Sequence, residues 1–413
     1  MIAFRSFLPR KCLAMMAATI LLSITAPAFA QAEENTSSEI TALREQADEL
    51  IEAEDYDKLV KVYQQLADAS DPFGMNGLGI SYAQGDGVEK DKAKAFLWFE
   101  KAAARNYPRS VTSLGLIYEQ GEGTKKDLAR ANSLYERAAG LGDARAMHFL
   151  GLNYEQAIGF EKDETKAFKW FQRAAEAGRG DSMHKLGLAF EEGRGTEKDL
   201  GAALLWYSRA AGEQQVSAYF ALGVMYEFGE GVARNDDAAF AWYKLSAEKG
   251  NAAGMNNVAN FLEHGRGTEK NIADALSWYE KGAEAGDDYA QANLGLIYLT
   301  GEHVKEDVKK GRKLLDKSIA QDSSYGMIRL GLAYEDGIGV EMDRGRSTKL
   351  FRQAADQGNA EAMRYLGINY QEGIGLLKDL NTAKIWYEKA IAAGDTQSED
   401  LYDKLVKEMA TEQ

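Results

Sequence analysis

Cysteine is nearly absent from this sequence. Cys12 is the only cysteine among 413 residues, so no disulfide can form within the chain. Small extracellular domains usually depend on disulfides because their cores are too small to be stable alone. A chain of this length without disulfides must instead be stabilised by a large packed core, and its content of 45% apolar residues argues against intrinsic disorder.

Long hydrophobic runs are also scarce, and the one that is present lies at the N-terminus. Three basic residues precede an apolar run over residues 13–26, and a small-x-small sequence follows at residues 28–30. These are the three parts of a secretory signal peptide. The run of about fourteen residues is shorter than the roughly twenty that a membrane-spanning helix needs. We expect residues 1–30 to be a signal peptide that is cut after Ala30, with an uncleaved anchor as the alternative, and no membrane span in the mature chain.

The expected export and the missing cysteines together suggest a compartment. Cys12 leaves with the signal peptide, so the mature chain has no thiol for disulfide formation, thiolate catalysis or lipid attachment. The bacterial periplasm best fits an exported protein that is stable without disulfides. We therefore expect a periplasmic localisation.

Positive charge is in short supply as well. The chain has 49 Lys and Arg residues against 64 Asp and Glu residues, a formal net charge of −15. Residues 1–30 hold three basic residues and no acidic ones, so the mature chain carries −15 − 3 = −18. A charge of this sign repels nucleic acid phosphates and anionic lipid. The sequence therefore predicts no nucleic acid partner.

The sequence motifs of enzymes are missing too. There is no GxSxG, HExxH, GxxxxGK[ST] or CxxC motif. SMHK (182–185) and SAEK (246–249) match the SxxK motif of penicillin-recognising enzymes, but the accompanying KTG and SDN motifs do not occur. His148 and His184 lie 36 residues apart and could meet at one metal, although two partly exposed helix residues are the favoured interpretation. We expect no catalytic activity, no cofactor and no metal site.

What the sequence does contain is a repeated pattern. The letters LGLIY occur at residues 114–118 and again at 294–298, a separation of 180 residues or five steps of 36. Nine repeats follow one another from Asp71 to Gly394 without insertion or deletion. Position zero of each repeat is the glycine of its LG pair, or the residue in its place: Gly79, Gly115, Gly151, Gly187, Gly223, Ala259, Gly295, Gly331 and Gly367. A period of about 20 to 50 residues indicates a stacked array.

Each repeat predicts two helices. Apolar residues at positions −4, −1 and +3 share one helical face and predict helix A, in which the glycine at zero allows a neighbouring helix to approach. A pair of glycines two residues apart follows in most repeats, and there a left-handed conformation can end the helix. Asp or Asn stands at position +12 in all nine repeats and predicts the N-cap of helix B. Helix B then carries a small residue at +16 and, in most repeats, an aromatic residue at +20.

The two ends of the array need caps, because a repeat cannot bury its apolar stripe alone. Residues 31–70 keep the repeat frame, with Asp55 at the N-cap position and Tyr63 at the aromatic one, and predict N-terminal capping helices. Residues 395–413 place Leu401, Leu405 and Met409 on one face and predict a C-terminal capping helix. The repeats over residues 71–394 and these caps predict an all-α solenoid.

The repeat resembles a known family. LGLAFEEGRGTEKDLGAALLWYSRAA (186–211) is similar to the Sel1-like repeat, a relative of the tetratricopeptide repeat. The resemblance covers residues 71–394 and implies a right-handed superhelix of helix pairs with an adaptor role in protein complexes. It also implies an exported bacterial protein that acts in envelope signalling or host contact. Cysteine-rich relatives are credited with binding or hydrolysing β-lactams, but they carry a disulfide in each repeat and this chain has none.

One face of helix A is a candidate binding surface. Position +1 is apolar in eight repeats, which is compatible with packing between successive A helices, but it is Asn260 in repeat six. The repeat positions that share this helical face with Asn260 form columns of equivalent residues along the array. In and beside repeat six these columns supply amide, aromatic and arginine side chains, a mixture enriched at protein interfaces. The residues predicted to bind a partner in the concave groove are Phe228, Asn257, Asn260, His264, Tyr289, Asn293, Tyr325 and Arg329. The equivalent positions of repeats one to four are less distinctive, so we expect the binding surface in repeats five to eight.

The leading hypothesis is therefore a non-catalytic periplasmic scaffold that binds a protein or peptide in its concave groove and regulates an envelope signalling or assembly complex. One alternative is an enzyme or binding protein that acts on cell-wall material or β-lactams. Another is an assembly protein that works through the ends of the array. The sequence predicts neither the partner's identity nor the oligomeric state.

Overall fold

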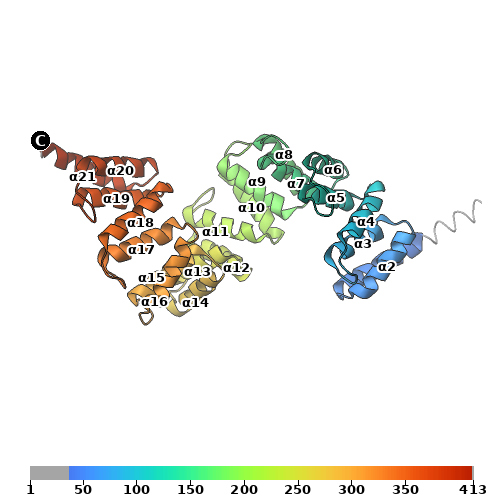
Figure 1. Cartoon of the computed structure of the whole chain (residues 1–413), viewed down its shortest axis with the longest axis horizontal. Helices are drawn as coiled ribbons and strands as arrows, with labels where there is room; N and C mark the ends of the chain where they lie inside the picture. Colours follow the sequence, from blue (N-terminus) through green and yellow to red (C-terminus); the bar gives the residue numbers. More distant parts are fainter. Residues whose placement is uncertain (1–36, 412–413) are drawn as a thin grey trace, which may run out of the picture. The chain divides into compact units, whose positions relative to one another are not determined.

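The computed structural model describes residues 37–411, so the predicted signal peptide lies outside the described residues. The regular structure in this range is entirely helical (Figure 1). A helix over residues 37–52 and α2 (Tyr56–Asp68) come first, nine helix pairs follow, and α21 (Gln397–Thr411) comes last. None of the helices in residues 37–411 combines the length and the apolar character needed to cross a bilayer.

Each repeat forms the two helices that its sequence predicts. The A helices are α3 (Pro72–Gln84), α5 (Pro108–Gln120), α7 (Ala144–Glu155), α9 (Gly180–Glu192), α11 (Val216–Phe228), α13 (Ala252–His264), α15 (Asp288–Thr300), α17 (Ser324–Asp336) and α19 (Ala360–Glu372). The B helices are α4 (Lys92–Ala104), α6 (Leu128–Gly140), α8 (Glu164–Glu176), α10 (Leu200–Gly212), α12 (Asp236–Glu248), α14 (Ile272–Glu284), α16 (Val308–Ile319), α18 (Arg344–Asp356) and α20 (Leu380–Ala392).

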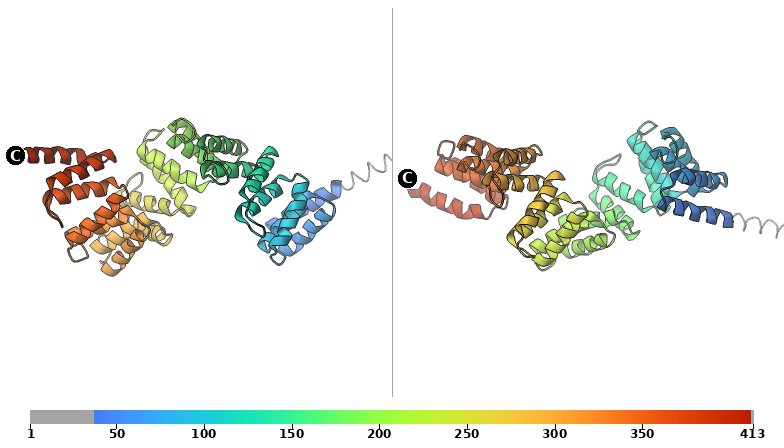
Figure 2. Two further views of the ribbon diagram at one scale, coloured as in Figure 1. Left: turned by 45° about the horizontal axis from the view of Figure 1, so that its top comes forward. Right: turned by 90° about the horizontal axis from the view of Figure 1, so that it is seen from below.

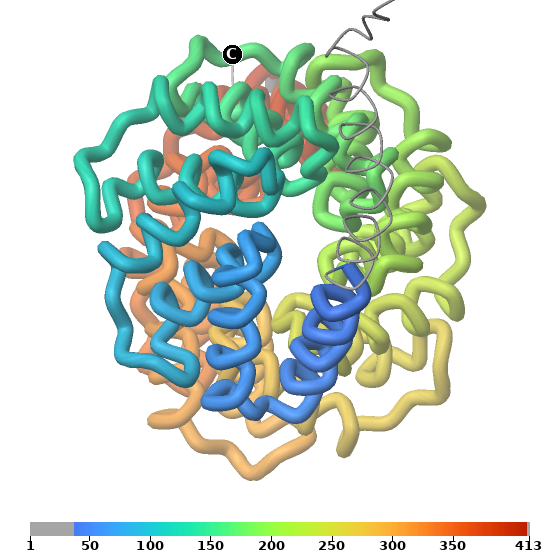
Figure 3. The backbone as a smooth tube through the Cα atoms, turned by 90° about the vertical axis from the view of Figure 1, so that its right-hand side faces the viewer, coloured from blue at the N-terminus to red at the C-terminus, as the bar shows by residue number. Residues whose placement is uncertain are grey.

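Neighbouring helices pack in the order of the chain. α3 lies against α4 and α4 against α5, and the same order of contacts recurs from α2 to α8 in unit 1 and from α10 to α21 in unit 2 (Figures 2 and 3). The chain divides into two compact units. Unit 1 reaches to Ser182 and includes residues 194–196, and unit 2 covers residues 183–193 and the chain from residue 197 onward. The prediction of an all-α solenoid of helix pairs is confirmed.

Every B helix begins at the predicted N-cap. Asp91 Oδ1 accepts hydrogen bonds from the backbone N–H groups of Ala93 and Lys94, at 3.0 and 2.9 Å. The same bond to the first turn recurs in all nine B helices, with Asn235 and Asn271 as the two amide caps. Such a cap satisfies backbone donors that the helix itself leaves unpaired and so stabilises the start of the helix.

The glycine pair ends helix A as predicted. Gly85 and Gly87 have φ angles of +92° and +68°, in the left-handed region where glycine is favoured. Two repeats depart from the pattern: Ala157 and His303 hold φ angles of +59° and +67° without being glycine. The loop geometry is therefore imposed by the packing of the helices on either side, even where the residue is unsuited to it.

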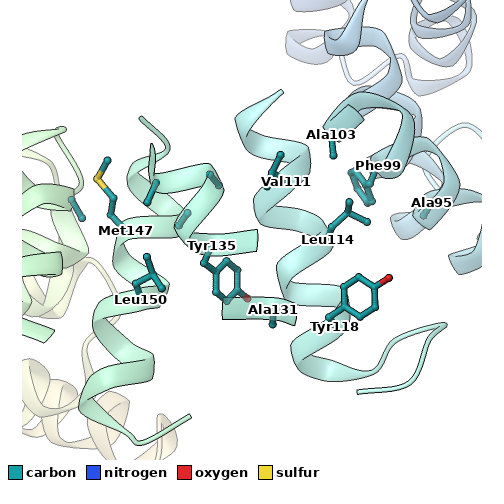
Figure 4. Packing of buried hydrophobic residues seen from close by; sticks show 14 residues of the cluster. Ala95, Phe99, Ala103, Val111, Leu114, Tyr118, Ala131, Tyr135, Met147 and Leu150 are labelled. Carbon is teal, nitrogen blue, oxygen red and sulfur yellow. The ribbon is translucent and has the colours of Figure 1, made fainter. Parts of the chain in front are cut away.

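The aromatic residue at +20 lies directly on the glycine at position zero. Tyr135 of α6 is fully buried in the core beside Leu114 and Leu150 (Figure 4). A Cβ atom at Gly115 would lie 2.4 Å from the Tyr135 ring. The neighbour that this glycine admits is therefore the side chain of its own repeat's B helix. The same contact joins Gly187 to Tyr207, among other pairs.

A buried tyrosine also needs a partner for its hydroxyl. Tyr135 Oη donates to Glu119 at 3.0 Å, and Tyr243 Oη donates to Glu227 at 2.6 Å. Burial, with the nearby carboxylate, raises the pKa of each phenol well above its ordinary value, so the hydroxyl keeps its proton. The repeat pattern did not predict this pairing of position +20 with position +4.

Both predicted capping segments pack on the array. The side chain of Asp55 caps α2, and Tyr63 is buried beneath the first repeat. At the other end, Leu405 of α21 is fully buried against α20, with Leu401 and Met409 packed around it. These helices cover apolar surface that the terminal repeats would otherwise expose.

The contact between ring and glycine predicts opposite effects for two glycines of repeat two. Gly115→Ala should destabilise the fold by about 1 to 3 kcal/mol, because the new methyl group meets the buried Tyr135 ring. Gly140→Ala should instead stabilise it by about 0.5 to 1 kcal/mol, because Gly140 is helical and has no atom within 4 Å of the added Cβ. Urea unfolding of both variants measures the difference. Equal effects would contradict the assigned role of position zero.

The N-caps predict a pH dependence. The backbone N–H of Lys94 holds the pKa of the Asp91 carboxyl below its usual range. A carboxyl whose folded pKa is lowered adds stability above its unfolded pKa of about 4, and that stability is lost as the pH falls through the folded value. In Asp91→Asn the cap cannot titrate, so the unfolding free energy should fall less than that of the natural chain between about pH 5 and about pH 2. Identical pH profiles in urea titrations would refute this role.

Candidate functional site

The eight residues predicted to bind a partner all lie on A helices of unit 2. α15 contacts α13 on one side and α17 on the other, whereas the B helices α14, α16 and α18 share no comparable contacts with one another. The stack therefore bends toward its A helices in this part of unit 2. The eight residues come from four A helices: Phe228 from α11, Asn257, Asn260 and His264 from α13, Tyr289 and Asn293 from α15, and Tyr325 and Arg329 from α17.

An aromatic stack is at the centre of the predicted site. The rings of Tyr289 and Tyr325 have their centroids 4.8 Å apart at an interplanar angle of 28°. The Arg329 guanidinium lies 4.4 Å from the centroid of the Tyr325 ring. Tyr289 is 49% exposed, so one side of the stack faces solvent. Burial of its other parts raises the pKa of Tyr289, which keeps the phenol protonated.

A row of amides continues from this stack. Tyr325 Oη donates to Asn293 Oδ1 at 2.7 Å, and Asn293 Nδ2 donates to Asn256 Oδ1 at 3.0 Å. Asn256 Nδ2 in turn donates to Asn257 Oδ1 at 3.2 Å. The structure thus joins side chains of α13, α15 and α17 in one network. Asn256 was missed by the sequence analysis, and its only signal was its place next to Asn257.

Asn260 belongs to a second group on α13. Its Oδ1 accepts from Arg266 Nη2 at 2.9 Å, and Arg266 also pairs with Glu227 at 2.9 Å. The Asn260 amide, which interrupts the otherwise apolar position +1, is therefore hydrogen-bonded within the fold, as a half-buried amide requires. His264 Nδ1 lies 2.9 Å from the Asn260 carbonyl oxygen, and its side chain is exposed. Phe228, at the end of α11, is 67% exposed.

The serines of the two SxxK sequences are not accessible. Ser182 and Ser246 are both fully buried. Ser182 Oγ lies 2.8 Å from His148 Nδ1, and His148 is itself buried, so the prediction of a partly exposed His148 was wrong. The histidine is held between helices by this bond and by its contact with Phe171. Within residues 37–411, no three His, Cys, Asp or Glu side chains come together in a way that could hold a metal ion.

A cavity in unit 1 was missed by the sequence analysis. It has a volume of about 660 Å³ and is lined by α3 and by the N-terminal ends of α5 and α7. Arg109, Arg145 and Arg179 line it, together with apolar side chains. The available signal was arginine at the same position, −6, of two successive repeats. A cavity of this size with a few polar groups is typical of a binding site.

Comparison with known proteins identifies a family. The Sel1 repeat model matches nine successive segments, namely residues 72–107, 108–143, 144–178, 180–213, 216–251, 252–287, 288–323, 324–359 and 360–395. No curated protein matches the chain.

Solved structures agree with this result. The chain is similar to a protective antigen of uropathogenic Escherichia coli strains that displays an SLR fold, at 30% identity over 84% of this chain and 82% of that one, with a TM-score of 0.61. It is also similar to a Sel1 repeat protein from Oxalobacter formigenes, at 31% identity over 57% of this chain and 95% of that one, with a TM-score of 0.51. Since the repeat matches cover most of its length, the chain belongs to the Sel1 repeat family, whose members are typically scaffolds for protein interactions.

Proposed function

We propose that this chain is a non-catalytic periplasmic scaffold that binds a protein or peptide partner on the A-helix face of unit 2 and serves an envelope signalling or assembly complex. The observation that carries the proposal is the half-exposed stack of Tyr289, Tyr325 and Arg329. Tyrosine and arginine are the side chains that most often dominate binding energy at protein interfaces. A stack held in place before binding also loses little conformational entropy when a partner arrives.

The network beside the stack suits a peptide backbone. Each asparagine amide has two donor hydrogens and one acceptor oxygen, and the internal bonds use only part of this capacity. A partner with carboxylate or carbonyl oxygens and N–H groups could use the remaining amide capacity, which supports a polar, extended ligand over a purely apolar one.

A catalytic function has less support. The candidate nucleophiles Ser182 and Ser246 are fully buried, so a substrate carbonyl could not reach them without local unfolding. The motifs that accompany SxxK in penicillin-recognising enzymes are absent from the sequence. Export is supported by the composition of residues 1–30, and the similar protein from uropathogenic Escherichia coli is described as a protective antigen, which agrees with a location outside the cytoplasm.

The proposed site predicts which exposed side chains matter. Tyr289→Ala should lower the affinity for the partner at least tenfold, about 1.4 kcal/mol, because it removes the exposed half of the stack. Its melting temperature should change little, since the ring is 49% exposed. Ile385→Ala is the matched control, because Ile385 is 50% exposed but lies on the B helix α20. The partner is the protein that the mature chain retains from a periplasmic extract. Equal affinities for the two variants would move the site away from this face.

Export predicts a defined mature N-terminus. When the full chain is expressed in a Gram-negative host, N-terminal sequencing of the periplasmic protein should begin at Gln31, because the apolar run over residues 13–26 is too short to remain as an anchor. Recovery of a protein that still begins at Met1, or its absence from the periplasmic fraction, would show that the assigned localisation is wrong.

A further inference from the structure

The cavity of unit 1 is lined by cations from successive repeats. Arg109 and Arg145 both stand at position −6 and occupy the first turns of α5 and α7. Arg179 lies just before α9 and closes the set. Three guanidinium groups thus line one cavity of a chain whose net charge is −15. Guanidinium groups in this arrangement attract an anion.

The acidic side chains at the cavity are already engaged. Asp143 Oδ1 caps α7 and accepts from the backbone N–H of Arg145 at 2.8 Å. Asp181 holds Arg179 Nη2 at 2.7 Å. Each of these carboxylates therefore compensates a charge or a helix end that is fixed within the fold.

Two of the arginines are left without a carboxylate. Neither Arg109 nor Arg145 has an acidic side chain within ion-pair distance among residues 37–411, and both are exposed. The Arg145 guanidinium lies 5.5 Å from the centroid of the Phe149 ring. The cavity thus offers two guanidinium charges, those of Arg109 and Arg145, that no carboxylate of the described residues neutralises.

The remaining surface of the cavity is partly apolar. Ile80 and Leu141 line it and are each 41% exposed, and Pro108, next to Arg109 in the first turn of α5, lines it as well. An inorganic anion would leave this apolar surface wet. A ligand that carries an apolar group next to its negative charge would cover it and gain the corresponding hydrophobic free energy.

We propose that this cavity binds a carboxylate carried by a peptide, with Arg109 and Arg145 as its charged contacts and Ile80 and Leu141 receiving the apolar side chain beside it. Arginine pairs with carboxylate through two parallel hydrogen bonds, which gives the contact direction as well as charge. The carboxylate belongs either to the C-terminus of the peptide or to an Asp or Glu side chain. The inference rests on the proposed function in one respect, because it takes the natural ligand to be part of a protein partner.

The test uses synthetic peptides and the mature chain. Fluorescence polarisation would follow three labelled probes: Ala-Ala-Ala-Leu with a free C-terminal carboxylate, the same peptide as the amide, and Ala-Glu-Ala-Leu as the amide. We expect the free acid to bind saturably and the neutral amide to bind at least tenfold more weakly. Binding of the Glu-containing amide at the strength of the free acid would assign the carboxylate to a side chain, and weak binding would assign it to the C-terminus.

The arginines are tested by a matched pair of double variants. Arg109→Gln with Arg145→Gln should lower the affinity for the carboxylate probe at least tenfold without a change in circular dichroism. Lys125→Gln with Lys169→Gln removes the same charge from exposed positions of unit 1 outside the cavity and should leave the affinity unchanged. Equal losses in both double variants would indicate general charge attraction and overturn the site, as would a failure of every carboxylate probe to bind.

These measurements are independent of the natural partner. Failure of the mature chain to retain any periplasmic protein would count against the proposed function, while saturable binding of the carboxylate probe would still support the cavity. Conversely, if partner binding requires Tyr289 but the cavity binds no probe, the proposed function would stand and this inference would be refuted.

Discussion

The array depends on one contact, which in seven of the nine repeats joins the aromatic ring of the B helix to the position-zero glycine of the A helix before it. The ring fills the space that a Cβ atom would take, so the two helices pack closely, and fully burying such a ring contributes about 1.5 to 3 kcal/mol. Repeat seven keeps the close approach with different residues, because Leu315 takes the place of the ring and Gly311 stands at position +16. A Cβ atom on Gly311 would lie 2.6 Å from the Gly295 carbonyl oxygen. What is fixed from repeat to repeat is therefore the close fit of the two helices, and the residues that achieve it can differ.

A constant core leaves the exposed columns free to vary. Position −6 carries Arg109 and Arg145 in unit 1 but Tyr289 and Tyr325 in unit 2. Because the repeats hold these positions in register, the same column forms a cationic cavity in one unit and an aromatic stack in the other. A scaffold built in this way can present chemically different surfaces without any change in its packing, which is consistent with stability that is set mainly by nearest-neighbour interfaces.

The fold could be predicted from the sequence because its signals are local. The N-cap at +12 lies two or three residues from the N–H groups that it satisfies, and Gly85 adopts its left-handed φ angle without the steric cost that a side chain would bring. The cap occurs in all nine repeats and the complete glycine pair in seven, so the register of helix A, loop and helix B was unambiguous. Departures such as His303 were visible as departures, although only the structure shows that the residue still adopts the left-handed conformation.

The sequence by itself determined the helices, their order and the columns of side chains that share a face, because these follow from the period and from capping within a few residues. Only the tertiary structure decided which side chains meet. Tyr325 and Asn293 are bonded across 32 residues, and Asn293 and Asn256 across 37. The tertiary structure also shows that Asn260 accepts a hydrogen bond from Arg266, and that arginines of successive repeats line a cavity. The physical reason is that a repeat pattern fixes each backbone position, while hydrogen bonds and cavities depend on rotamers and on distances of a few ångströms between helices, which the pattern leaves open.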